Sequence, residues 1–238
     1  MYLAACKRSK RYSSNDFANS GYTTVVITAV FAAYFVGAVA QQAEWATLAW
    51  TSALSLSYAI VMLTMPALGE WADRHAAKKK LLMLVTAACV LSTAALSWVR
   101  PGQVALAVVC IVISNTFYSY GESLTAAFLP ELARPEAMGR ISAWGWAWGY
   151  LGGMLTLGIC LAYVLWAQGQ GQSAGQFVPV TMWVTAAIYA ISASLTFWLM
   201  KEHAKPQVHR VRASSQWQQW HVVVSLQLDD VPVKDGGH

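Results

Sequence analysis

The sequence is poor in charged residues. Only 11% of its 238 residues are Asp, Glu, Lys or Arg, whereas 57% are hydrophobic; an ordinary soluble domain has about 25% charged residues. The few charges are gathered in short segments, which leaves long stretches without any. This pattern excludes a soluble globular protein, whose surface needs charge throughout, and predicts an integral membrane protein.

Cysteine is also scarce. The four cysteines do not form a Cys-x-x-Cys pair, and three of them fall inside apolar stretches: Cys89, Cys110 and Cys160, with Cys6 near the N-terminus. This spacing argues against a disulfide framework or a metal site, and favours packing as small apolar side chains. We therefore expect no metal and no cofactor.

Motifs of enzyme active sites are missing as well. Residues 171–175 read Gly-Gln-Ser-Ala-Gly and fit the hydrolase pattern Gly-x-Ser-x-Gly. That pattern has meaning only on a strand-turn-helix elbow, whereas here it falls between two expected membrane helices. Because the sequence offers no other catalytic constellation, we expect that the protein is not an enzyme.

What the chain has instead is a series of charge-free apolar runs. Each is long enough to cross a bilayer as a helix, which takes roughly 20 residues, and a helix satisfies its backbone polar groups within the segment. The first run is too long for a cleaved signal peptide. The prediction is an all-α membrane protein, a bundle of six transmembrane helices, with spans at Ala18–Ala40, Ala46–Leu68, Leu81–Val99, Gln103–Gly121, Ile141–Ala167 and Phe177–Met200.

The basic residues predict how the chain crosses the membrane. If the N-terminus is cytoplasmic, all 16 Lys and Arg residues except Arg100 lie on the cytoplasmic side, as the positive-inside rule requires. This bias explains the net charge of +5 without a nucleic-acid partner. We expect a cytoplasmic N-terminus at 1–17, a six-helix transmembrane domain at 18–200, and a polar, flexible cytoplasmic tail at 201–238.

The segment between the second and third spans carries Gly69, Asp73 and Arg74, followed by Lys78–Lys80. One interpretation is an ordinary loop whose cations hold it at an anionic inner leaflet. Its spacing, however, resembles the signature loop of the major facilitator superfamily, Gly-x-x-x-Asp-Arg-x-Gly-Arg-Arg/Lys. The basic end matches only roughly, because Ala76 and Ala77 stand where that pattern has Gly and Arg.

Other segments resemble a narrower branch of that superfamily, the vacuole effluxer-like family, which contains the yeast vacuolar amino-acid effluxer and many bacterial relatives. The matching segments are residues 16–20, 128–133 and 139–153. Asn15 and Ala126 depart from the family pattern, where an aromatic residue and an Asn are common. The resemblance covers about residues 15–200 and does not reach the tail.

Two polar residues mark the start of the first span. Asp16 can cap the helix N-terminus or contact a solute. Asn19 lies almost one turn further along, where an amide in hydrocarbon needs a partner. We expect an interhelical hydrogen bond there, with contact to substrate as the alternative.

In the fourth span, Asn115, Tyr118 and Glu122 fall at i, i+3 and i+7, which places them on one face of a helix. If the helix continues to Pro130, Glu122 lies roughly two turns inside it. An ionisable residue there indicates a proton relay or a binder of cationic substrate. The alternative is an interfacial glutamate that reaches the cytoplasm.

The fifth span is striped with glycine. Gly145, Gly149 and Gly153 recur at every fourth position, and Gly152 adjoins the last of them. Small residues at this spacing let another helix approach closely; the alternative is a flexing element, because adjacent glycines weaken a helix. Trp144, Trp146 and Trp148 near the cytoplasmic end suit an interfacial aromatic belt.

The family resemblance implies a bundle equivalent to the N-terminal half of a major facilitator transporter, built from two inverted three-helix repeats. It implies secondary transport of a small solute by alternating access, with amino-acid efflux favoured, in the inner membrane of a bacterium. The expected partners are the lipid bilayer and a small solute.

The length of the chain leaves the assembly open. Because members of the family carry about twelve spans, the chain is truncated or frameshifted with a nonnative tail, has its second half on a separate polypeptide, or pairs as a homodimer. The opposing hypothesis is a non-transporting membrane protein: a remnant, a scaffold or a regulatory subunit.

Overall fold

The computed structural model describes residues 19–132 and 135–199. The predicted N-terminal segment with Asp16, and the predicted tail, lie outside these residues. Within them every regular element is helical, and six helices are long and apolar enough to cross a membrane: Asn19–Val39, Ala46–Arg74, Lys78–Trp98, Val104–Ala127, Ser142–Gly169 and Ala174–Trp198. The prediction of an all-α bundle of six membrane helices is confirmed.

The first span is not a uniform α-helix. After a helical turn at residues 19–22 it continues as the π-helix η1 (Thr23–Ala29), the α-helix α2 (Val30–Tyr34) and a second π-helix, η2 (Phe35–Val39). The N–H of Ala40 accordingly bonds to the carbonyl of Phe35, five residues back, at 2.8 Å. Most π-helical segments are single turns and many occur at functional sites, which draws attention to this helix.

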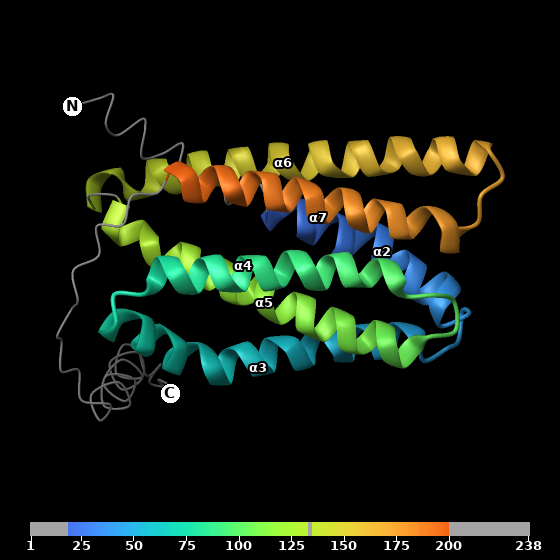
Figure 1. The fold of residues 1–238 in the computed structure, drawn as a ribbon, viewed down its shortest axis with the longest axis horizontal. Coiled ribbons are helices and arrows are strands. Elements are labelled where there is room, and N and C mark those ends of the chain that lie inside the picture. The colour runs from blue at the N-terminus through green and yellow to red at the C-terminus, as the bar shows by residue number, and fades with distance from the viewer. Residues whose placement is uncertain (1–18, 133–134, 200–238) are drawn as a thin grey trace, which may run out of the picture. The chain divides into compact units, whose positions relative to one another are not determined.

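The remaining spans are long helices that lie side by side (Figure 1). They are α3 (Ala46–Arg74), α4 (Lys78–Ala95) with the short 3₁₀ turn η3 (Leu96–Trp98), α5 (Val104–Leu132), α6 (Pro135–Gly169) and α7 (Ala174–Leu199). Of the six spans, α4 has the largest buried share and α3 the smallest. The helix α4 packs against α3, α5 and α7, whereas α6 packs against α7, α5 and the first span.

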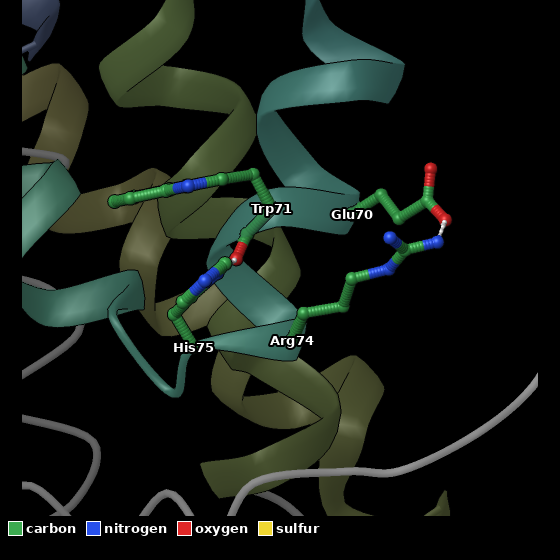
Figure 2. A network of polar contacts seen from close by, with 4 residues as sticks. All are labelled: Glu70, Trp71, Arg74 and His75. Atoms are coloured by element: carbon green, nitrogen blue, oxygen red, sulfur yellow. Dashed lines mark hydrogen bonds and ion pairs between the residues drawn. The ribbon is translucent and has the colours of Figure 1, made fainter.

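The end of α3 differs from the prediction. The charged segment that follows Leu68 is helical as far as Arg74, and α4 already begins at Lys78, so only a short turn at His75–Ala77 separates the two helices. Glu, Ala and Arg are good helix formers, and charged side chains at a span end reach water without breaking the helix. Figure 2 shows this end, where Arg74 pairs with Glu70 and the His75 ring lies 2.9 Å from the Trp71 carbonyl oxygen.

The turn retains its tight geometry without the expected glycine. Ala76 has φ +48°, in the left-handed region that favours glycine, at the position where the superfamily pattern has Gly. An ion pair of 2.7 Å between Asp73 and Lys78 joins the two helices across the turn. The signature residues Gly69, Asp73 and Arg74 therefore lie on the last two turns of α3 rather than in a loop.

The polar connection between the fourth and fifth spans is also mostly helical. The helix α5 extends through Pro130 to Leu132, and α6 begins at Pro135, a position that suits proline because the first helical N–H has no intrahelical partner. Glu122 therefore lies inside α5, roughly 15 Å before its end at 1.5 Å per residue.

Aromatic packing fixes the first span inside the bundle. The ring of Trp50 on α3 lies 6.0 Å from that of Phe31 and 5.3 Å from that of Phe35, between centroids. Both phenylalanines are fully buried. Close packing of this kind holds membrane helices together, so the first span is fixed at this end, while its opposite end, at Asn19, carries polar residues.

Candidate functional site

A cavity of about 580 Å³ lies between the first span, α5 and α6, within the size range of small-molecule sites. The first span lines it with polar residues: Asn19, Ser20, Thr23 and Thr24. The helix α5 contributes Tyr118, Glu122 and Ala126. The helix α6 contributes Trp146, Gly149, Tyr150, Gly153 and Met154.

Asn19 belongs both to the cavity wall and to an interhelical hydrogen bond. Its Oδ1 atom accepts a bond of 2.8 Å from the Tyr189 hydroxyl of α7, and its side chain is nearly buried at 5% exposure. Tyr189 is therefore the expected interhelical partner of the amide, and Asn19 also lines the cavity.

Tyr118 is tied to the same part of the first span. Its hydroxyl lies 2.8 Å from Thr23 Oγ1, which in turn lies 3.1 Å from the backbone oxygen of Asn19. Its ring stacks on that of Tyr22, with centroids 4.7 Å apart. A continuous chain of hydrogen bonds thus runs from α5 through the first span to α7 and fixes two walls of the cavity.

Glu122 lies one turn beyond Tyr118 and is exposed. It is the single charged residue among the described residues that line the cavity, and no ion pair joins it to another described residue. Glu122 lies close to the end of the apolar span Val104–Ala127, and an ionised side chain that faces hydrocarbon within a span is unfavourable. This face of α5 is therefore suited to water, a solute or another protein surface rather than to lipid.

The glycines of α6 allow the first span to approach. A Cβ atom added at Gly153 would lie 3.0 Å from Thr24 Oγ1 and 3.3 Å from the Ser20 carbonyl oxygen, so the contact has no room for a side chain. Gly149 lines the cavity with it, and Gly145 and Gly152 are buried on the same helix.

Two aromatic residues of α6 lie on the open side of the cavity. Trp146 and Tyr150 are one turn apart, their ring centroids are 5.9 Å apart, and 65% and 66% of their surfaces are exposed. Trp146 was expected with Trp144 and Trp148 in an interfacial belt; the structure shows that it also lines the cavity.

Asn115 does not line the cavity, although it shares a helix face with Tyr118 and Glu122. It is fully buried, and its Nδ2 donates a hydrogen bond of 2.5 Å to Ser57 Oγ on α3. Its Oδ1 has no hydrogen-bond partner in the part of the chain that the structure describes. The predicted face is therefore divided between an α3–α5 contact and the cavity.

Some site residues were not singled out by sequence reasoning. Ser20, Thr23 and Thr24 continue from Asn19 at i+1, i+4 and i+5, a helical spacing that could have revealed one polar face. Tyr189 lies 170 positions away from Asn19, and no local pattern links the two.

The described residues of the lining offer a carboxylate, hydroxyl and amide groups, and aromatic rings. Within residues 19–132 and 135–199, no group of three or more His, Cys, Asp and Glu side chains is placed to hold a metal ion.

The chain is similar to a known protein family. The family described as "Vacuole effluxer Atg22 like" matches residues 32–228. The match extends past the sixth span, so the expectation that the resemblance stops before the tail is wrong.

Among curated proteins, the chain is similar to YxiO of Bacillus subtilis (strain 168), an uncharacterized MFS-type transporter. The two are 31% identical over 169 residues, which cover 69% of this chain and 39% of that protein. No solved structure matches the chain.

Proposed function

Since the chain belongs to the vacuole effluxer Atg22-like family of MFS-type transporters, we propose that it forms one six-helix half of a transporter and that its cavity is part of the solute path. The solute is small, because the cavity holds about 580 Å³. The aligned region spans 39% of the length of the curated relative, and a second bundle is therefore part of the proposal.

The observation that carries the proposal is the position of Glu122. It is an exposed carboxylate inside a membrane-spanning helix, at the edge of a cavity lined by polar side chains. Ionisable residues in such positions commonly mark substrate or ion pathways. A second bundle over this open side would enclose the cavity and shield Glu122 from lipid.

The proposed mechanism is alternating access. One six-helix bundle rocks against another around a site near the bilayer midplane, so that the cavity opens to each side of the membrane in turn. The second bundle is supplied by further spans of the same protein, by a separate polypeptide or by a second copy of this chain. The close contact of α6 with the first span at Gly153 keeps the cavity walls together during the movement.

Amino-acid efflux is the favoured transport reaction. The family description supports export, and a carboxylate among hydroxyl and amide groups offers acceptors to an amino group. We propose that the protein resides in a bacterial inner membrane with both termini in the cytoplasm, because the basic residues favour that orientation.

Reconstitution tests the function. The chain is purified from its native membranes with any polypeptide that accompanies it, and exchange of radiolabelled amino acids is measured in proteoliposomes. We expect exchange above that of protein-free liposomes, reduced in Glu122→Gln and unchanged in Glu44→Gln, which neutralises an exposed glutamate in the loop before α3. Absence of exchange for every amino acid, with no second six-helix polypeptide in the preparation, would contradict the proposal and favour a non-transporting membrane protein.

A further inference from the structure

We propose that the cavity binds the ammonium group of its solute, between the Glu122 carboxylate and the aromatic rings of α6. This inference rests on the proposed function and narrows its solute class to protonated amines. Amino acids belong to this solute class if this six-helix half binds their amino group.

The first argument is charge. Glu122 is the single charged residue among the described residues that line the cavity, and no described cation neutralises it. Within a bundle the effective dielectric constant is well below that of water, so a lone carboxylate attracts a cation and repels an anion strongly. An ammonium group therefore gains most from this position.

The second argument is the direction of the hydroxyl groups. Thr24 Oγ1 donates its hydrogen to the Ser20 carbonyl at 2.7 Å, and Thr23 Oγ1 lies 3.1 Å from the Asn19 carbonyl. Alternatively, the Thr23 hydroxyl donates its hydrogen to the Tyr118 hydroxyl oxygen at 2.8 Å. In either case the hydrogens of the two threonine hydroxyls are used within the protein, and lone pairs of their oxygens remain.

This arrangement selects for a donor. An ammonium group has three N–H donors and no acceptor, whereas a carboxylate has acceptors only. The oxygens of Thr23 and Thr24 can accept from an ammonium group, whereas their hydrogens are already used within the protein. These two threonines and Glu122 thus favour the same chemical group.

The third argument is the aromatic wall. Trp146 and Tyr150 line the cavity with about two thirds of their surfaces exposed, 65% and 66%. A cation over the face of Trp or Tyr is attracted by the ring quadrupole. Met154 and Ala126 offer apolar surface for the remainder of the solute.

The test compares two ligands that share one side chain. L-norleucinamide carries an ammonium group and no carboxylate, and N-acetyl-L-norleucine carries a carboxylate and no ammonium group. Their binding to the purified full chain in lipid nanodiscs is measured by calorimetry at pH 6.5, where α-amino groups with a pKa of about 7.7–8.0 are protonated. We expect norleucinamide to bind at least about tenfold more tightly, a difference of about 1.4 kcal/mol.

Matched variants assign the binding to the cavity. Glu122→Gln keeps the size of the side chain and should weaken norleucinamide binding about tenfold or more, while Glu44→Gln should leave it unchanged. Trp146→Leu should weaken it severalfold, and Trp146→Phe should retain it, because the phenyl ring preserves the aromatic face. Thermal unfolding of each variant verifies that it is folded.

The outcomes separate this inference from the proposed function. Equal or tighter binding of N-acetyl-L-norleucine, no binding of norleucinamide, or binding that is insensitive to Glu122→Gln in a folded protein overturns the ammonium site. If Glu122→Gln stops exchange in proteoliposomes but leaves norleucinamide binding intact, Glu122 serves as a proton relay and the inference is wrong. Glu122-dependent binding without exchange supports the ammonium site and contradicts the transport function.

Discussion

The hydroxyl of Tyr189 in α7 donates a hydrogen bond of 2.8 Å to Oδ1 of Asn19 in the first span. Both side chains are nearly buried, at 3% and 5% exposure. The bond joins the last described helix to the start of the first, and Asn19 also lines the cavity. The cavity wall therefore depends on a contact between distant parts of the sequence.

Removing this hydroxyl should weaken the bundle. Tyr189→Phe leaves the Asn19 amide oxygen buried without its partner, and the free energy of unfolding should fall by about 0.6–2 kcal/mol, the range for interhelical hydrogen bonds in membranes. The measurement is an unfolding titration in mixed micelles. Tyr163→Phe is the control, because Tyr163 is half-buried on α6 and makes no hydrogen bond to another described residue; an equal loss in both variants would contradict the role of the bond.

A side chain at Gly153 should separate α6 from the first span. The added methyl group of Gly153→Ala would lie 3.0 Å from Thr24 Oγ1 and 3.3 Å from a backbone oxygen that cannot move independently, so we expect a loss of about 1–3 kcal/mol. Gly158→Ala on the same helix meets no atom within 4 Å and should be neutral or stabilising by up to about 1 kcal/mol. Unfolding titrations measure the free energy of unfolding of each variant. Equal values for Gly153→Ala and Gly158→Ala would contradict this contact.

The comparison of Glu122 with Asn115 shows what the sequence could predict. Six charge-free runs were enough for six spans, and helical spacing predicts one shared face of α5 for the two residues. Spacing alone could not show which neighbour covers each turn of that side. Ser57 of α3 covers Asn115, whereas Glu122 is uncovered, and this difference arises from tertiary packing.

Helix ends were predicted less well, for a physical reason. Charged residues mark the ends of the predicted spans, yet α3 continues past Glu70 to Arg74. Charge is excluded from hydrocarbon but is compatible with a helix, so hydropathy marks the membrane boundary and not the end of the helix. The π-helical turns of the first span, which give Thr23 and Thr24 their place, have no signature in hydropathy at all.

Glycine at position 76 should stabilise the turn between α3 and α4. Ala76 adopts φ +48°, where a side chain costs roughly 1–2 kcal/mol; part of this is offset by the greater freedom of glycine in the unfolded chain. We expect Ala76→Gly to raise the free energy of unfolding by about 0.5–1 kcal/mol. Ala67→Gly, inside α3, should instead lower it by about 1 kcal/mol, and a loss in both variants would contradict the strain at Ala76.

The distribution of basic residues predicts the orientation in the membrane. Alkaline phosphatase, which is active only outside the cytoplasm, should be active when fused after Gly171 and inactive when fused after Lys79, because the cations of the latter segment favour the cytoplasm. Enzymatic activity of the two fusions in whole cells is the measurement. The reverse pattern would overturn the proposed orientation.

The central claim is that the cavity beside Glu122 is a water-accessible solute path and not a lipid-facing hollow. Neighbouring positions on α6 provide a direct test, since Met154 lines the cavity while Leu155, also exposed, is absent from its lining. In a background with the native cysteines replaced by alanine, Met154→Cys and Leu155→Cys are treated in membranes with a membrane-impermeant thiol reagent, which reacts with thiolates in contact with water. The account predicts that the cysteine at position 154 reacts, that norleucinamide protects it, and that the cysteine at position 155 does not react. Equal reactivity at the two positions, or no reaction at position 154, would contradict it.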